Sequence, residues 1–277
     1  MDLNWFEGIL YGLFTGLAEI LPVSAHAHKL LLLKIFGAGA ESPLMGLMIH
    51  LGVLAALYYG CQNHIIRILR AKRLSRIPKR RRKRPLDTRS LKDFSLFRFM
   101  VAPVILAFCF YRKLEPIRYK MIWMAVFVMV NGFVLYLPQF FHGGNKDSRN
   151  MTRLDALLSG LGGAVDILPG MSGVAGATSV ASVCGVDRMY ALNLTLLMTM
   201  GTMAGYGVHD VMNLVSAGIS EGFGTILVYI LAGAASFGGA SLGIRALRAM
   251  VEEIGFSVFA YYCWGLSLFT VVINLLA

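Results

Sequence analysis

Charged side chains are scarce in this sequence of 277 residues. Only 15% of its residues are Asp, Glu, Lys or Arg, and 57% are hydrophobic, whereas a soluble domain usually carries about 25% charged residues. Five stretches contain no Asp, Glu, Lys or Arg: 42–66, 121–145, 189–209, 222–244 and 254–277. Each is longer than the roughly 20 residues that a helix needs to cross a bilayer. This pattern excludes a single soluble domain and predicts a polytopic membrane protein.

Cysteine is also sparse. The four cysteines, Cys61, Cys109, Cys184 and Cys263, lie far apart, and none forms a CxxC pair. This spacing argues against a disulfide framework and against a cysteine-ligated metal cluster. The first residues lack a basic segment and a small-residue cleavage site, so we expect no removable signal peptide.

Acidic residues are few, 15 against 26 Lys and Arg, which gives a net charge of +11. Thirteen of the basic residues lie between 67 and 92 with a single acid, so this segment carries +12 and the remainder is about neutral. A base-stacking surface needs aromatic side chains, and 77–85 contains none. We therefore predict no nucleic-acid binding but a basic cytoplasmic loop at 67–92, which lies against anionic lipid.

The apolar segments predict an all-α polytopic protein with six transmembrane helices and two re-entrant helix-break-helix segments. The six spans are expected at about 44–60, 95–111, 119–138, 188–212, 223–244 and 254–276. The segments 5–36 and 153–186 are apolar but interrupted by a Leu-Pro step. Proline removes a backbone donor and disfavours helix in the residue before it. At membrane depth such a break is tolerated where it is buried in protein or lines a polar cavity.

The two interrupted segments resemble each other. In both, an acid lies three residues before the proline, Glu19 before Pro22 and Asp166 before Pro169, and three spans follow. A re-entrant segment adds no crossing and three is odd, so the second copy must be inverted. We therefore predict a single membrane domain, 1–277, with repeat halves at about 1–138 and 153–277. In such inverted repeats, the helix breaks mark the binding site.

Ionisable side chains inside membrane segments are candidates for function, because their burial is costly. The first broken segment supplies Glu19, His26 and His28, and His50 begins the next span. Glu19 adjoins the break and is the stronger candidate, whereas we interpret His26 as a neighbour of the site and His50 as a packing residue. Asp166 either caps a helix N-terminus or joins the site as the counterpart of Glu19.

Hydroxyl and glycine residues follow both breaks. Ser24, Ser172 and Thr178 offer hydroxyl groups, and Gly170 and Gly173 leave backbone N–H groups that an anion can approach closely. The pattern is typical of phosphate-binding turns. The same small residues also permit close packing of helices, so both interpretations stay open.

Segments 16–24, 49–52, 168–172 and 185–188, together with His28, resemble the undecaprenyl-diphosphate phosphatase, or bacitracin-resistance, family in order and spacing. The resemblance covers essentially the whole chain. It implies a multi-pass enzyme of the bacterial inner membrane that hydrolyses a C55 polyprenyl diphosphate to the monophosphate. It also implies a divalent cation, Mg²⁺ or Ca²⁺.

The resemblance implies roles for individual residues. Glu19, His28 and Ser172 are the implied catalytic residues, and the implied substrate-binding residues are Ser24, Gly170, Gly173 and Thr178. Glu19 would hold the cation, and we hypothesise that Asp166 is its second carboxylate ligand.

Three positions depart from the family pattern. Thr15 stands where the family has its first glutamate, Ala25 where it has a second serine, and Gly173 where it has a phosphate-binding arginine. Arginine binds phosphate through paired, charge-assisted hydrogen bonds, so its loss matters most. We hypothesise that Lys29 or Arg188 brings compensating positive charge.

Two other functions stay open at this point. A non-catalytic paralogue that binds or flips polyprenyl phosphate would explain the three departures together, and a secondary transporter for another anion would rest on the repeat alone. The expected partners are the polyprenyl diphosphate lipid and the membrane. The sequence leaves the oligomeric state open, with a homodimer as one candidate.

Overall fold

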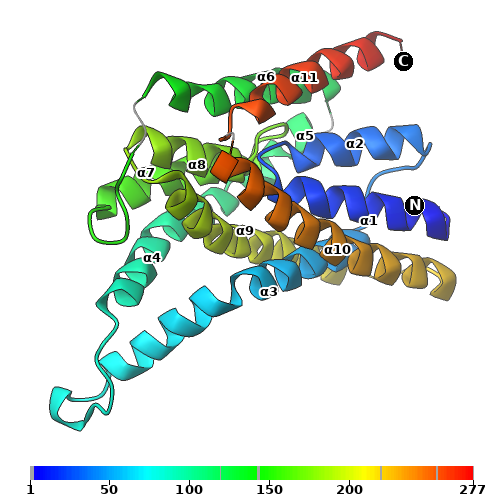
Figure 1. The fold of residues 1–277 in the computed structure, drawn as a ribbon. Helices are drawn as coiled ribbons and strands as arrows, with labels where there is room; N and C mark the ends of the chain where they lie inside the picture. Colours follow the sequence, from blue (N-terminus) through cyan, green and yellow to red (C-terminus); the bar gives the residue numbers. More distant parts are fainter. Residues whose placement is uncertain (1–2, 119, 142–143, 219, 254, 277) are drawn as a thin grey trace.

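The computed structural model describes residues 3–118, 120–141, 144–218, 220–253 and 255–276. Across these ranges it is helical, with one isolated parallel bridge between Lys146 and Val186 (Figure 1). The α-helices are α1 Trp5–Ile20, α2 Ala25–Ile35, α3 Pro43–Ser75, α4 Thr88–Phe108, α5 Glu115–Arg118, α6 Met121–Tyr136, α7 Arg153–Ala164, α8 Gly173–Val183, α9 Arg188–Ala217, α10 Phe223–Glu253 and α11 Val258–Leu276. Short 3₁₀ helices are η1 Lys79–Arg81, η2 Tyr111–Leu114, η3 Leu137–Phe140 and η4 Val165–Ile167. The all-α prediction is confirmed.

Four helical stretches among the described residues are long and apolar enough to cross a membrane: Pro43–Ser75, Met121–Phe140, Phe223–Val251 and Val258–Leu275. α4 and α9 cover the other two predicted spans, but neither combines the length and the apolarity of these four stretches. α4 carries Arg98 and α9 carries Asp210. The protein is therefore a multi-pass membrane protein with four clearly apolar spans.

Both predicted breaks are present, and both are built in the same way. α1 ends before Leu21 and Pro22, and α2 begins after Ser24, whose Oγ accepts a hydrogen bond from the Ala27 N–H at 3.2 Å. In the second segment, the Ser172 Oγ accepts from the Ala175 N–H at 3.3 Å and caps α8. Serine at this position satisfies a backbone donor that the new helix leaves unpaired.

One side chain of α6 joins the two breaks. The Asn131 side-chain amide donates to the Pro22 carbonyl at 3.2 Å, and its oxygen accepts from the Ser172 N–H at 3.0 Å. Asn131 is fully buried. The two breaks therefore lie within reach of a single amide group, although they are about 150 residues apart in the sequence.

The two halves pair their helices in a matching pattern. α1 packs on α10 and α7 packs on α4, while α3 lies against α9 and α6 against α11 (Figure 1). Glycine allows the closest of these approaches, because a Cβ added at Gly16 of α1 would lie 2.2 Å from the Ser236 carbonyl oxygen of α10. The α1–α2 pair and the α7–α8 pair lie on opposite sides of the molecule, on the right and left of Figure 1.

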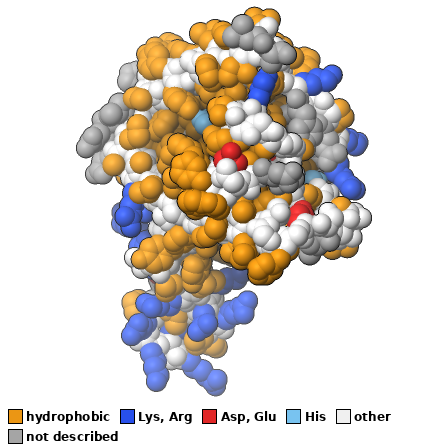
Figure 2. All heavy atoms as spheres, turned by 90° about the vertical axis from the view of Figure 1, so that its right-hand side faces the viewer, with side chains coloured by type: hydrophobic (Ala, Val, Ile, Leu, Met, Phe, Trp, Pro, Cys, Tyr) orange, Lys and Arg blue, Asp and Glu red, His pale blue; other side chains and the backbone are white. Residues whose placement is uncertain are grey.

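The basic segment 67–92 is not a loop throughout. α3 continues to Ser75 and α4 begins at Thr88, so the non-helical part is shorter than predicted. Lys and Arg are good helix formers, which explains why α3 continues past its apolar part. α3 has 33 residues and is therefore about 50 Å long. Figure 2 shows a large group of Lys and Arg side chains on the part that projects downward, below the acidic side chains of this face.

Candidate active site

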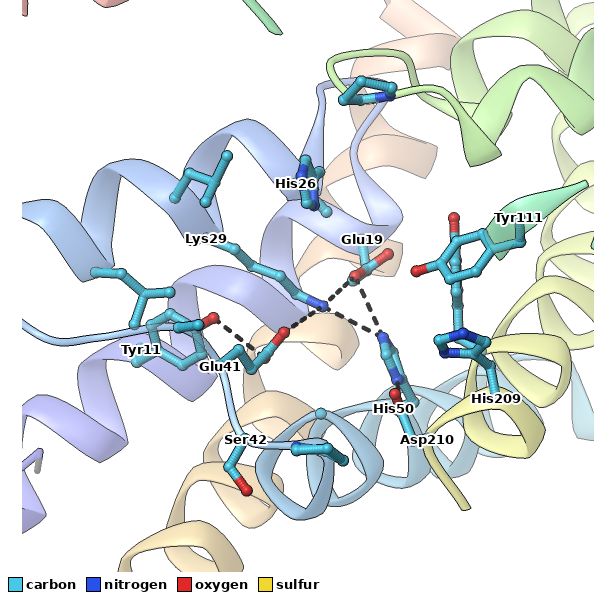
Figure 3. Close-up of a pocket in the computed structure, with 18 of the residues that line it drawn as sticks. Tyr11, Glu19, His26, Lys29, Glu41, Ser42, His50, Tyr111, His209 and Asp210 are labelled. Carbon is cyan, nitrogen blue, oxygen red and sulfur yellow. Dashed lines mark hydrogen bonds and ion pairs between the residues drawn. The ribbon is translucent and has the colours of Figure 1, made fainter. Parts of the chain in front are cut away.

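A cavity of about 510 Å³ lies between the first broken segment, the N-terminal end of α3 and the C-terminal half of α9. It is at the end of α3 opposite the basic segment. Residues 166–169 and Met171, next to the second break, complete the wall. The ionisable and hydroxyl groups that line it are Tyr11, Glu19, His26, Lys29, Lys34, Glu41, Ser42, His50, Tyr111, Asp166, Tyr206, His209 and Asp210 (Figure 3).

Lys29 lies at the centre of this cluster. Its Nζ is 3.2 Å from Glu19 Oε1, 3.8 Å from Glu41 Oε2 and 3.3 Å from His50 Nε2. The three partners come from α1, from the segment between α2 and α3, and from α3 (Figure 3). The side chains of Lys29 and Glu19 are 10% and 8% exposed, so each needs the other as its counter-charge.

The hydrogen bonds of His50 fix its tautomer. An ammonium can only donate, so His50 Nε2 must accept from Lys29. Nδ1 then carries the proton and donates to Asp210 Oδ2, 2.6 Å away. A carboxylate that orients an imidazole in this way leaves Nε2 as a base directed at the cavity, an arrangement that hydrolases use to activate a nucleophile. The ring also stacks on Tyr206, with centroids 5.2 Å apart.

Glu41 lines the cavity from the short segment that connects α2 to α3. Its carboxylate accepts from the Tyr11 hydroxyl at 3.1 Å as well as pairing with Lys29. A Cβ added at Gly37 or Gly39 would meet no atom within 4 Å. Glu41 is 24% exposed, more than Glu19. It is therefore the more easily displaced of the two carboxylates.

Ser42, the next residue, also lines the cavity and binds a carboxylate. The Ser42 hydroxyl donates to Glu221 Oε1 at 2.5 Å and lowers the pKa of that carboxyl group. Ser42 also caps α3 by accepting from the Leu44 N–H. The contact links the start of α3 to the connection between α9 and α10.

Asp166 lines the cavity from the side of the second break. Its Oδ1 accepts from the Gly173 N–H at 2.6 Å, and its Oδ2 accepts from the Tyr206 hydroxyl at 2.9 Å. A Cβ added at Gly173 would lie 2.8 Å from the Gly163 carbonyl oxygen and 2.9 Å from Asp166 Cβ. Position 173 is therefore crowded, and Asp166 both holds the start of α8 and borders the cavity.

The remaining predicted residues lie elsewhere. His28 directs its Nδ1 at the Ser24 carbonyl and its Nε2 at the Tyr262 hydroxyl, both at 2.6 Å, so its ring faces α11. Thr178 donates to the Val174 carbonyl within α8. Of the predicted site residues, the cavity wall includes Glu19 and Asp166, but not His28, Ser24, Ser172, Thr178, Gly170 or Gly173.

Several residues of the cavity wall were not predicted as site residues. His26 and His50 line the wall, although the first was interpreted as a neighbour and the second as packing. Asp210 and Glu41 were not predicted. Both stand at the edge of a stretch without charged side chains, and this position was the available signal. Asn131, which joins the two breaks outside the cavity wall, was also not predicted, and its signal was a polar amide in the middle of an apolar span.

Comparison with known proteins places the chain in a family. The family model described as bacitracin resistance protein BacA matches residues 8–269. The chain belongs to this family. It is 29% identical over 264 residues to an undecaprenyl-diphosphatase of Methanobrevibacter smithii, with 93% of each chain covered. It is 24% identical to the undecaprenyl-diphosphatase of Carboxydothermus hydrogenoformans, with 98% of each covered, and 25% identical to undecaprenyl-diphosphatase 3 of Bacillus cereus, with 96% of each covered.

The cavity of this BacA-family protein does not fit the divalent cation that the resemblance implies. Within the described residues, no three His, Cys, Asp or Glu side chains are grouped so that they could hold a metal ion. Glu19, the implied ligand, already pairs with Lys29, and both Asp166 oxygens accept from fixed donors. A divalent ion about 4 Å from an ammonium would be opposed by roughly 8 kcal/mol at an effective dielectric constant of 20. Metal and ammonium therefore compete for one place.

Proposed function

We propose that this protein is an undecaprenyl-diphosphate phosphatase, which hydrolyses the terminal phosphoanhydride bond of the lipid. Membership of the BacA family supports this, as does the name undecaprenyl-diphosphatase of relatives that are similar over nearly the whole chain. The single structural observation that carries the proposal is the buried cluster of Lys29, Glu19 and the His50–Asp210 pair. It places a cation and an oriented base at one cavity.

The proposed topology has six spans and two re-entrant segments in an inverted repeat, with α4 and α9 as the two less apolar spans. The matching helix pairs of the two halves support it. With the basic segment in the cytoplasm, the cavity at the other end of α3 opens to the outer face of the bacterial inner membrane. The prenyl tail would lie between the apolar helices. A homodimer stays a prediction.

The geometry supports a direct division of roles. The Lys29 ammonium leaves His50 Nε2 and binds oxygens of the terminal phosphate, where it stabilises the developing negative charge. His50 Nε2, now free, accepts a proton from the attacking water while Asp210 stabilises the imidazolium. The water oxygen bonds to the terminal phosphorus and the bond to the bridging oxygen breaks. The products are orthophosphate and polyprenyl monophosphate.

Glu19 keeps Lys29 charged and in place throughout this sequence of steps, because it is the buried carboxylate nearest to Nζ. The roles that the resemblance implies for His28 and Ser172 as catalytic residues, and for Ser24, Thr178, Gly170 and Gly173 in substrate binding, stay predictions. In this geometry, His50 is the better placed base.

The test is release of orthophosphate from C55 polyprenyl diphosphate by the purified protein in detergent. We expect turnover by the wild type and a strong loss in Glu19→Gln. Absence of turnover, alongside retained binding of C55 monophosphate, would instead favour a lipid carrier. Glu7→Gln is a matched control, because Glu7 lies on the same helix and caps it through the Asn4 N–H, away from the cavity.

A further inference from the structure

The surroundings of Lys29 form a built site for one cation. An ammonium has three N–H donors, and Nζ has three acceptors within 4.0 Å, each from a different part of the chain. Two of these acceptors are carboxylates, which favour the charged form of the ammonium. Lys29 is buried, although lysine is rarely buried in proteins.

The same carboxylates are the groups that a divalent cation would need. Mg²⁺ in phosphate-binding enzymes usually uses one or two carboxylates together with substrate phosphates. Glu19 and Glu41 are two such carboxylates, and the Lys29 ammonium lies within 4.0 Å of both. A metal ion can take this place only if the lysine side chain leaves it.

In the proposed reaction His50 gives up its contact with the Lys29 ammonium, and the Glu41 carboxylate is exchangeable as well. Glu41 is the most exposed of the three acceptors and is the furthest from Nζ, and it stands on a segment whose glycines have open space around them. A phosphate oxygen of the substrate carries the same negative charge and can replace the Glu41 carboxylate on Nζ. Glu19 would hold the lysine in place meanwhile.

We propose that Lys29 is the resident cation of the active site and that the phosphatase reaction of this chain needs no divalent metal. The inference rests on the proposed function. Lys29 then binds the terminal phosphate directly, and the positive charge is part of the polypeptide instead of being recruited from solution. Lys34, exposed on the same helix, contacts the Met121 sulfur at 3.8 Å instead of a carboxylate.

The first test measures phosphate release from C55 diphosphate in excess EDTA. We expect the wild type to change by less than about twofold, and Lys29→Ala to lose about 10²- to 10³-fold, the usual effect of removing one transition-state charge contact. Lys34→Ala should stay close to the wild type in its response to EDTA. Loss of wild-type turnover in EDTA, with recovery on adding Mg²⁺ or Ca²⁺, would overturn the proposal.

The second test does not depend on turnover. Binding of Mn²⁺ to purified protein is followed by the electron paramagnetic resonance signal of free Mn²⁺. We expect no bound equivalent in the wild type or in Lys34→Ala, and one in Lys29→Ala that disappears when Glu19→Gln is added. One equivalent bound to the wild type and lost in Glu19→Gln would overturn the proposal.

The two tests separate the inference from the proposed function. If no variant or metal condition gives phosphate release, the proposed function fails, and the Mn²⁺ titration still decides whether Lys29 fills the cation site. If Lys29→Ala does not fold, the wild type alone still gives both the EDTA response and the Mn²⁺ titration, and either result supports or overturns the proposal.

Discussion

The two broken segments have the same backbone break but differ in the side chains that follow it. Both have a Leu-Pro break, and in both a serine caps the second helix through its Oγ. Five residues beyond that serine, however, the first segment has Lys29 and the second has Ala177. The lysine reaches into an acidic cluster, whereas Ala177 is fully buried and packs near Gly163 of α7.

This difference explains why the cavity belongs mainly to one half. α8 consists of small and β-branched residues, packs on α7 and α9, and is buried along almost its whole length. α2 instead faces α3 across the cavity and contacts it through Lys29 and His50. The second broken segment is packed against its neighbours along α8, whereas the first supplies the charged residues of the cavity. Asn131 ties the two together.

The strongest test of this difference is to remove the proposed base, His50. In His50→Asn, the asparagine amide can still donate to Asp210, but no group replaces Nε2. We expect kcat/KM for C55 diphosphate to fall about 10²- to 10⁴-fold, the usual contribution of a general base. The measurement is steady-state phosphate release at several substrate concentrations.

His28→Asn is the matched comparison, because the resemblance implies that His28 is catalytic, as base or nucleophile, while its ring faces Tyr262 on α11. We expect a loss below about tenfold. A larger loss in His28→Asn than in His50→Asn would show that the catalytic centre lies on the α11 side of α2, and our assignment of the base would be wrong.

The sequence predicted the helical class, the two breaks and Glu19 from local signals. The pattern of apolar residues, prolines and serines determines helices and breaks within a few residues of each other, and the structure contains these helices and breaks. The partners of Lys29 could not be predicted in this way, because Glu41 and His50 reach its ammonium from separate elements. Which face of α2 turns toward α3 depends on packing in three dimensions, so His28 and Lys29, neighbours in sequence, lie on different sides of the helix.

A second prediction concerns the packing of α8 in the second broken segment. A Cβ added at Gly176 of α8 would lie 2.0 Å from the Gly162 carbonyl oxygen of α7, so Gly176→Ala must push the two backbones apart. We expect a loss of about 1–3 kcal/mol in stability, as for overpacked cores, seen as a lower midpoint of thermal unfolding in detergent. Gly39→Ala in the connection between α2 and α3, where an added Cβ meets nothing within 4 Å, should stay within about 0.5 kcal/mol. Equal effects at both positions would contradict the contrast between the crowded and the open position.

The smallest expected effect concerns Glu41, the cavity carboxylate in the connection between α2 and α3. Glu41→Gln removes a charge that competes with substrate phosphate for Lys29, so KM should fall about three- to fivefold with kcat little changed. This corresponds to roughly 0.5–1 kcal/mol, the size of a partly exposed ion pair. Glu221→Gln is the matched control, because its carboxylate accepts from Ser42, the neighbour of Glu41, but does not line the cavity, and its KM should stay near that of the wild type. An unchanged or raised KM in Glu41→Gln would mean that Glu41 holds Lys29 in position instead of yielding it to the substrate.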